Sequence, residues 1–225
     1  MILITGQELR EIAPKLKATR AAEIAALHNK IAPTYGIDTL DEFEEFLANV
    51  TQESGEYEHK SEDLYYRPER LAEIWPSTFS ETKHRPYIPN DNAQKYARNP
   101  AALGNFKYGG KYGNRPGTND GYDYRGAGFI GLTFRSTFEA YQKYLNKKNG
   151  TTATVEQVTA MVRTTDLYAL DSAYWFFSIL KGLNDEAERD EWRKIVKAIN
   201  GGFIGIEDRE KYLARVKKVF ARKQP

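Results

Sequence analysis

Two glutamates in the first third of the chain have the residue type and spacing needed for acid–base chemistry. In the stretch Thr51–Tyr57, which reads TQESGEY, Glu53 lies directly before a Ser-Gly break, and Glu62 follows nine residues later. A pair of carboxyl groups can supply one general acid and one general base. The residues alone do not decide whether Glu62 or one of its neighbours, Glu56 or Glu58, is the second member of the pair.

A helix is predicted directly upstream, and it positions Glu53. Thr39 and Glu42 form an S/T-x-x-E capping box, and apolar residues follow at helical spacing. Continued at about 3.6 residues per turn, the helix places Glu53 at the edge of its buried face. Partial burial raises the pKa of a carboxyl group, as a general acid working near neutral pH requires. The alternative interpretation is a solvated glutamate at a helix end. The apolar positions are Phe43, Phe46, Leu47 and Val50.

Composition limits the classes of function open to the 225-residue chain. Lys and Arg number 33 and Asp and Glu 31, which gives a formal net charge of +2 and no general basic field for nucleic acid. The absence of cysteine excludes disulfides and thiolate sites. His28, His59 and His84 lack the spacing of a metal-binding helical pair. We therefore expect no nucleic-acid partner, no metal and no other cofactor.

The two ends of the chain bear on its location. The N-terminal residues lack the pattern of a signal peptide, and no apolar run approaches the roughly 18 residues of a membrane span, so we expect cytoplasmic retention. Seven basic residues and one acid lie between Arg209 and Pro225. The helix predicted there has Val216, Val219 and Phe220 on one side. It is a candidate contact for anionic envelope lipids, although a packed terminal helix explains the same pattern.

Residues 104–131 contain nine of the 17 glycines of the chain, interleaved with six aromatic residues. Such glycine density suits tight turns, short hairpins and close approach of the backbone to a ligand. The aromatic rings fit a sugar-binding cleft and equally the core of a small lobe. The GxGxxG match at Gly126–Gly131 follows no buried strand, so we exclude nucleotide binding. The aromatic residues are Phe106, Tyr108, Tyr112, Tyr122, Tyr124 and Phe129.

The remaining segments are predicted to be mostly helical scaffold. Two short helices are expected within residues 6–34 and a loop within residues 76–92. Several helices follow Thr133, and the segment from Leu167 to Phe177 is apolar nearly all round, which predicts a central, buried helix.

Four linked stretches resemble the family 19 glycoside hydrolases, the chitinase-like enzymes that include many phage endolysins with a lysozyme-like fold. Their order and spacing also match, and the resemblance covers nearly the whole chain. The stretches are QESG at Gln52–Gly55, YARNP at Tyr96–Pro100, YRGAGFIGLT at Tyr124–Thr133, and INGG at Ile199–Gly202 with Asp208 and Arg209 after it.

The resemblance assigns roles to particular residues. It implies that Glu53 is the general acid, Glu62 the general base and Thr133 the hydroxyl that holds the attacking water. Glu56 and Glu58 lie outside the matching positions and are expected to be solvated. Enzymes of the family invert the anomeric centre, which requires carboxyl groups about 6.5 to 9.5 Å apart. The residues implied to bind substrate are Tyr124, Arg125, Asn200 and Arg209.

Two positions depart from the usual family pattern. Ala127 and Gly131 stand where an arginine and a glutamine are usual. The glutamine usually touches an N-acetyl group of the substrate. We hypothesise that Gly131 widens the cleft for the lactyl group of N-acetylmuramic acid.

Together these features predict a mainly α, lysozyme-like protein with a single catalytic domain over residues 1–225. A small Gly/Tyr-rich lobe with a short β-hairpin, about residues 56–130, would be inserted in a larger helical lobe, with the active cleft between them. We expect a monomeric endolysin that hydrolyses β-1,4 bonds of bacterial peptidoglycan. It would stay in the cytoplasm of the infected bacterium until a pore protein releases it to the cell wall. The alternatives are a chitinase acting on N-acetylglucosamine polymers and a non-catalytic cell-wall glycan-binding module.

Overall fold

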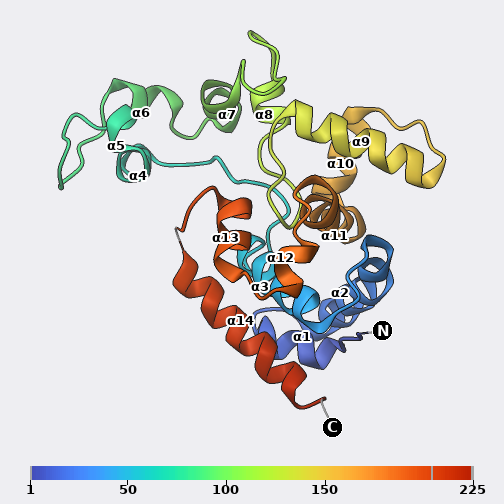
Figure 1. Cartoon of the computed structure of the whole chain (residues 1–225). Coiled ribbons are helices and arrows are strands. Elements are labelled where there is room, and N and C mark those ends of the chain that lie inside the picture. The colour runs from blue at the N-terminus through green and yellow to red at the C-terminus, as the bar shows by residue number, and fades with distance from the viewer. Residues whose placement is uncertain (1, 204, 224–225) are drawn as a thin grey trace. The chain divides into compact units, whose positions relative to one another are not determined.

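The protein is described by a computed structural model that covers residues 2–203 and 205–223. Its contacts divide the chain into two compact units. Unit 1 comprises Met1–Lys60, Ala127–Leu132 and Tyr144–Pro225, and unit 2 comprises Ser61–Gly126 and Thr133–Lys143. Helices dominate both units (Figure 1), which confirms the predicted mainly α class.

Unit 1 begins with helices whose starts are encoded locally. Thr5 with Glu8 and Thr39 with Glu42 form complete capping boxes, so backbone N–H groups that lack partners within the helix are satisfied at the starts of α1 and α3. The N-terminal elements are α1 (Gly6–Ile12), α2 (Ala18–Ile31), a 3-10 turn (Ala32–Tyr35) and α3 (Leu40–Glu53).

The second half of unit 1 is also helical. A capping box of Thr154 and Gln157 begins α10. The apolar segment expected to be central is confirmed as a buried helix that changes to π-helix at Trp175, although its first apolar residue, Leu167, is exposed. The elements are α10 (Val155–Thr164), α11 (Asp166–Tyr174), the π-helical segment (Trp175–Leu180), α12 (Asn184–Glu188), α13 (Trp192–Asn200) and α14 (Ile206–Ala221).

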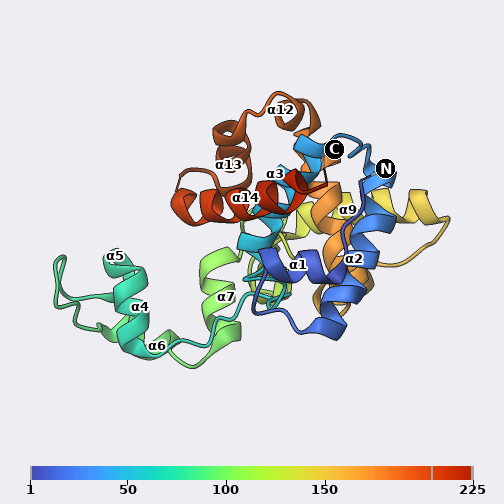
Figure 2. The same ribbon diagram turned by 90° about the horizontal axis from the view of Figure 1, so that it is seen from below.

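The core of unit 1 forms around α3. Phe46 stacks on Tyr174 with ring centroids 3.9 Å apart, and Phe43 meets Phe220 edge to face at 5.8 Å. Figures 1 and 2 both show α3 beside α14, as these contacts require. The apolar stripe predicted from the sequence is therefore the buried face of α3, whose last residue is Glu53.

Unit 2 is built from short helices joined by turns. Residues 76–92, expected to be a loop, begin with one helical turn because Pro76 occupies a first helical position. The helices are α4 (Pro68–Ile74), α5 (Pro76–Phe79), α6 (Asp91–Tyr96), α7 (Pro100–Tyr108) and α8 (Asp120–Asp123), and α9 (Arg135–Asn149) continues from unit 2 into unit 1. The apolar core of the unit contains Leu64, Leu71, Phe79, Ala93 and Leu103.

Glycines allow α7 and α8 to pack closely. A Cβ atom at Gly104 would lie 2.9 Å from the Cα atom of Tyr122, and one at Gly121 would lie 2.6 Å from the carbonyl oxygen of Gly104. Neither distance permits a side chain, so part of the glycine density is a packing requirement. Isolated antiparallel bridges join Ser80 with Pro89 in unit 2 and Ala127 with Leu132 in unit 1.

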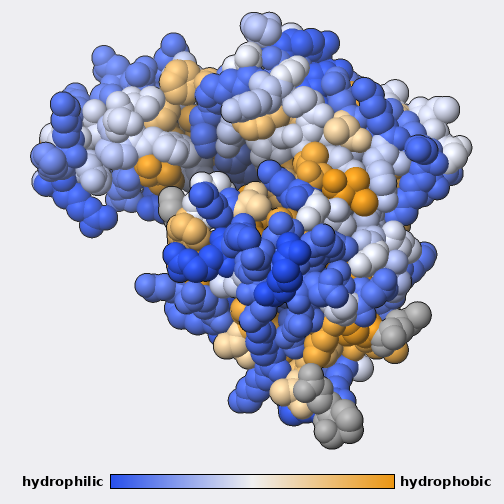
Figure 3. Space-filling model, viewed as in Figure 1, coloured by the Kyte–Doolittle hydropathy of each residue, from blue (hydrophilic) through white to orange (hydrophobic). Residues whose placement is uncertain are grey.

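The face shown in Figure 3 is largely hydrophilic, with smaller apolar areas between the polar ones. Across the part of the chain that the structure describes, no helix combines the length and the apolar character needed to span a membrane.

Candidate active site

Glu53 is the last residue of α3 and lies at the edge of the unit 1 core. The apolar residues before it on the helix are buried, whereas its own side chain is 24% exposed. The predicted position at the edge of the buried face is therefore confirmed.

Arg209 holds the carboxylate of Glu53. Its Nη2 donates to Glu53 Oε1, and its Nη1 donates to Asn49 Oδ1 at 2.9 Å. Arg209 lies in the first turn of α14, where the helix dipole disfavours a positive charge, and it is only 3% exposed. Charge-assisted hydrogen bonds to the two acceptors offset the cost of burying the guanidinium. The pairing joins residues 156 positions apart in the sequence.

The turn after Glu53 is fixed by polar contacts. Gly55, Glu56 and Tyr57 have φ angles of +58°, +65° and +65°, so two non-glycine residues adopt the left-handed conformation. Ser54 Oγ accepts a 2.8 Å bond from the N–H of Tyr57.

The expectation that Glu56 is solvated is wrong, because its side chain is buried at 3% exposure. The Glu56 carboxylate accepts hydrogen bonds from the backbone N–H of Lys15 at 2.7 Å and from the hydroxyl of Tyr212 at 2.8 Å. These bonds stabilise the turn that follows Glu53. Glu58 is exposed, as expected.

The buried side chain of His28 contacts the turn that follows Glu53. His28 Nδ1 is 2.7 Å from the hydroxyl of Tyr174, and His28 Nε2 is 3.0 Å from the hydroxyl of Tyr57. Burial lowers the pKa of His28 to about 3, so the ring is neutral near pH 7. This histidine has a structural role in supporting the turn that follows Glu53.

In unit 2, main-chain contacts hold Glu62 against the segment around Gly126. The N–H of Glu62 donates to the carbonyl oxygen of Gly126 at 2.8 Å, and Arg125 Nε donates to the carbonyl oxygen of Glu62 at 3.0 Å. The YRGAG motif therefore binds the backbone of the predicted base, a contact that local sequence patterns do not encode.

The Glu62 carboxylate is surrounded by donors from α7. The hydroxyl of Tyr108 donates to Oε1 at 2.8 Å and to Oε2 at 3.0 Å, and Lys107 Nζ lies 3.5 Å from Oε1. The N–H of Gly126 approaches Oε2 at 3.4 Å. Burial, with the nearby Glu62 charge, raises the pKa of Tyr108, so its hydroxyl stays a donor. The sequence indicated Tyr108 only as one aromatic residue of the glycine-rich tract and did not indicate Lys107, and no local pattern predicts that either residue contacts Glu62.

Glu62 and Thr133 converge at Gly126. A Cβ atom at Gly126 would lie 3.6 Å from Glu62 Oε2 and 3.7 Å from Thr133 Oγ1. A carboxylate that accepts and a hydroxyl that both donates and accepts can hold one water molecule between them. The structure therefore brings together the two unit 2 residues to which the resemblance assigns the attacking water.

The other residues expected to bind substrate differ in their accessibility. Tyr124 is 2% exposed, packs against Phe138 and accepts a 2.8 Å bond from Arg135, so the expectation of substrate contact is corrected to a packing role. Arg125 is half-buried, with its guanidinium 4.0 Å from the Tyr122 ring. Asn200 is exposed at the end of α13.

Gly131 has a backbone reason to be glycine. Its φ angle is +69°, a left-handed conformation that disfavours most side chains, and nothing lies within 4 Å of the position where a Cβ atom would stand. The usual glutamine would therefore be strained at this position.

An aromatic groove runs beside the Glu62 donors, with a volume of about 630 Å³. Tyr112 is 71% exposed in it, and Lys107 Nζ lies 3.9 Å from the ring of Trp75. Some rings of the Gly/Tyr-rich tract therefore pack against the core of unit 2, and others line a groove. The lining residues are Trp75, Thr78, Phe79, Phe106, Lys107, Tyr108, Lys111, Tyr112 and Phe134.

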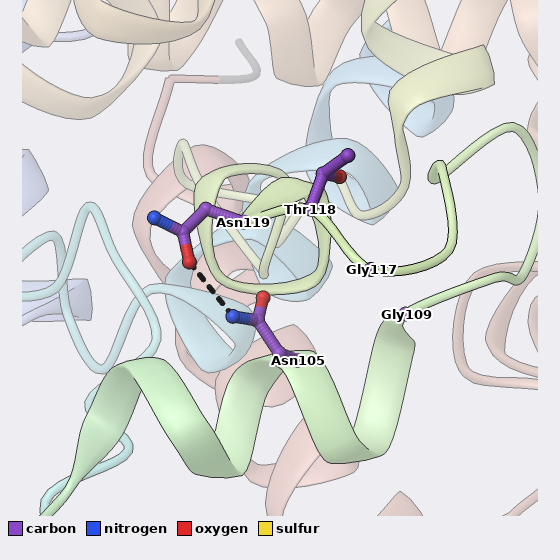
Figure 4. A pocket seen from close by; sticks show the side chains of 5 residues that line it. All are labelled: Asn105, Gly109, Gly117, Thr118 and Asn119. Atoms are coloured by element: carbon purple, nitrogen blue, oxygen red, sulfur yellow. Dashed lines mark hydrogen bonds between the residues drawn. The ribbon is translucent and has the colours of Figure 1, made fainter.

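A second pocket in unit 2 is lined by polar side chains and glycines (Figure 4). Asn105 Nδ2 donates to Asn119 Oδ1 at 2.9 Å across it, and Gly109, Gly117 and Thr118 complete the lining. No titratable side chain lines this pocket, so it offers no acid–base chemistry. Among the residues for which the structure gives positions, no group of three or more histidine or acidic side chains is arranged to hold a metal ion.

Comparison with known proteins places this geometry in a family. No protein-family model matches the chain. A protein of Haemophilus influenzae described as a glycosyl hydrolase family 19 domain-containing protein is 30% identical over 166 residues, which cover 73% of this chain and 72% of that protein. The crystal structure of chitinase C from Streptomyces griseus HUT6037 is similar with a TM-score of 0.57 and 14% identity, over 97% of this chain and 76% of that chain.

The structural likeness confirms the predicted lysozyme-like fold and, with the sequence relative, defines the class of the protein as a glycoside hydrolase. The chain belongs to glycosyl hydrolase family 19.

Proposed function

We propose that the protein is an endolysin that hydrolyses β-1,4 glycosidic bonds of bacterial peptidoglycan with inversion. Glu53 is the general acid, Glu62 is the general base, and Thr133 holds the attacking water. The single observation that carries the proposal is the convergence of the Glu62 carboxylate and the Thr133 hydroxyl at Gly126, in a chain of this family.

The proposed reaction is one displacement. Glu53 gives its proton to the glycosidic oxygen as the bond from that oxygen to the anomeric carbon breaks. The oxygen of the water bonds to the anomeric carbon from the opposite face, and Glu62 takes the proton that the water loses. Glu53 ends ionised and Glu62 protonated, and exchange with solvent restores both.

The charge of the aromatic groove favours peptidoglycan as the substrate. Lys107 and Lys111 line the groove, and no acid is among its lining residues. Peptidoglycan carries carboxylates on its stem peptides, whereas chitin is uncharged. Aromatic faces that pack on sugar rings, together with ammonium groups nearby, suit an anionic glycan.

The first test compares wild type with Glu53→Gln and Glu62→Gln on purified peptidoglycan. Clearing by wild type alone, with a new reducing end on each fragment, supports the proposal. Both glutamine variants should lose at least about 100-fold in rate, the usual contribution of a positioned acid or base. Proton NMR during the first minutes should show the α anomer from a β bond.

Other outcomes of the same experiment lead to other functions. Cleavage of chitin oligosaccharides without clearing of peptidoglycan would make the protein a chitinase. Sedimentation with cell walls and no turnover on either polymer would make it a glycan-binding module.

A substitution at Gly131 tests whether the protein prefers substrates that contain N-acetylmuramic acid. We propose that the absence of a side chain at Gly131 leaves room for the lactyl group. Gly131→Asn is the appropriate variant because asparagine tolerates the left-handed backbone better than glutamine. It should lower the ratio of peptidoglycan to chitin cleavage, and an unchanged ratio would refute this role.

We propose that the protein is a monomer held in the cytoplasm of the infected bacterium until a separate pore protein releases it. In unit 1 the apolar residues of α14, Val216, Val219 and Phe220, are buried, so a lipid contact would have to use its cationic face. Vesicle sedimentation with anionic lipids tests that contact.

A further inference from the structure

We propose that Tyr108 is a positioning residue for Glu62, which it orients, together with Lys107, so that Oε2 is the oxygen that receives the proton of the attacking water. This inference rests on the proposed role of Glu62 as base. Neither residue belongs to the motifs that carry the family resemblance.

The first step of the argument is the difference between the two carboxylate oxygens. Oε1 has the shorter bond from the Tyr108 hydroxyl, at 2.8 Å, and the Lys107 ammonium at 3.5 Å. Oε2 has the longer Tyr108 contact, at 3.0 Å, and faces Gly126 on the side where Thr133 Oγ1 lies. Oε1 is therefore held by both α7 residues, whereas Oε2 has only the longer Tyr108 contact from α7 and faces the side of Thr133.

The second step concerns the donor. A single phenolic proton shared between both oxygens fixes the plane of the carboxylate, since rotation of that plane would lengthen one of the two contacts. Each carboxylate oxygen has two lone-pair sites, and on Oε2 the second has only the long 3.4 Å contact from the N–H of Gly126, which a water molecule can replace. Burial raises the pKa of Tyr108, and the hydroxyl therefore remains a donor at any pH at which the enzyme works.

The third step is the support of the two residues themselves. Lys107 Nζ also lies 3.9 Å from the ring of Trp75, a cation–π contact that holds the ammonium beside Glu62. The ring of Tyr108 packs edge to face against Phe134 with centroids 5.7 Å apart. Both donors are thus held by packing within unit 2 as well as by the carboxylate.

The test uses Tyr108→Phe and Lys107→Met, with Tyr65→Phe as the matched control. Tyr65 is 58% exposed, so Tyr65→Phe removes the same hydroxyl from an exposed position in the same unit. Because misplacement of a reacting group by about 1 Å costs on the order of 100-fold, Tyr108→Phe should lower kcat by about 10- to 100-fold with KM within about twofold. Lys107→Met should lower kcat less. Thermal unfolding of each variant shows whether it is folded.

A positioning role predicts dependence on Glu62. Tyr108→Phe should reduce kcat when Glu62 is present and should have no effect on the residual rate of Glu62→Gln. An equal loss in both backgrounds, or a rise in KM without a fall in kcat, would overturn the inference.

The failure of this inference differs from the failure of the proposed function. If wild type cuts only chitin oligosaccharides, the proposed substrate is wrong, and the same variants decide the inference on that polymer. A wild type that cuts neither polymer would overturn both.

Discussion

The two units hold their candidate catalytic carboxylates in different ways. In unit 1, Glu53 is paired with a buried guanidinium, and the core behind it contains the ionisable groups His28, Glu45 and Glu56. In unit 2, Glu62 is held by a phenol, a backbone N–H and a partly buried lysine, over an apolar core. Buried ionisable groups make stability depend on pH, whereas steric fit does not.

The difference extends to acid stability. The buried carboxylate of unit 2, Asp120, is ionised, because hydrogen bonds from Arg115 lower its pKa to about 2. Its contribution to stability is present above the unfolded pKa of 3.8 and is lost only as the pH falls towards 2. Unit 1 should respond to acid at a higher pH, because His28 is buried neutral.

The largest expected effect comes from breaking the charged pair of unit 1. Arg209→Met leaves Asn49 and Glu53 without their donor, so the free energy of unfolding should fall by about 3 kcal/mol and activity should be lost. Arg209→Lys should lose less stability but not recover full activity, since a lysine does not reproduce the two-pronged contact. Urea unfolding measures both variants. A loss below about 1 kcal/mol in Arg209→Met would contradict the importance of this pair.

The second prediction is loss of stability in mild acid. The folded pKa of His28, about 3, lies below the unfolded value of 6.5, so the unfolded state binds the proton first as pH falls. Stability should decline by up to about 1.4 kcal/mol per pH unit below pH 6.5 and level off near pH 3. In His28→Gln this dependence should disappear, whereas exposed His84→Gln should retain it. Equal slopes in the two variants would refute the assignment.

The third prediction has the opposite sign. Burial, with the nearby Asp190, raises the pKa of Glu45 from 4.5 to about 8, so the folded state binds the proton more tightly than the unfolded state. Stability from this group is present below pH 4.5 and declines as the pH rises towards 8. Glu45→Gln should therefore gain stability relative to wild type at pH 9, by about 1 kcal/mol or more. Thermal unfolding at pH 6 and pH 9 measures the effect, with exposed Glu58→Gln as the control.

The smallest effect on stability is expected in unit 2. A Cβ atom at Gly126 would stand 3.3 Å from Glu62 Cβ, a contact that shifts the glutamate by a few tenths of an ångström. Gly126→Ala should change the free energy of unfolding by less than about 1 kcal/mol. It should nevertheless lower kcat several-fold, because the carboxylate moves relative to Thr133. Unaltered kcat in a folded variant would show that the base tolerates displacement.

Much of the fold was predictable because its signals are local. A capping box and apolar periodicity predicted the start and buried face of α3 and the central helix that includes Tyr174. The single turn of α5 was missed, since four residues are too short to show a period.

The candidate site was predictable only where a motif identified it. Glu53 and Thr133 lie in the linked motifs, and the resemblance assigned Glu62 as the base between them; their proposed roles await the experiments above. Burial decided Glu56 and Tyr124 differently from the sequence pattern, because Tyr212 of α14 binds Glu56 and Phe138 of α9 packs against Tyr124.

The sequence by itself determined the family, the helical class and the position of Glu53 at the end of an amphipathic helix. These features depend on the order of residues within one helix or one motif. Only the tertiary structure decided that Arg209 pairs with Glu53 across 156 residues and that Tyr108 binds Glu62 across 46. Such contacts are created when distant segments pack together, and no local period in the chain encodes which side chains will then meet.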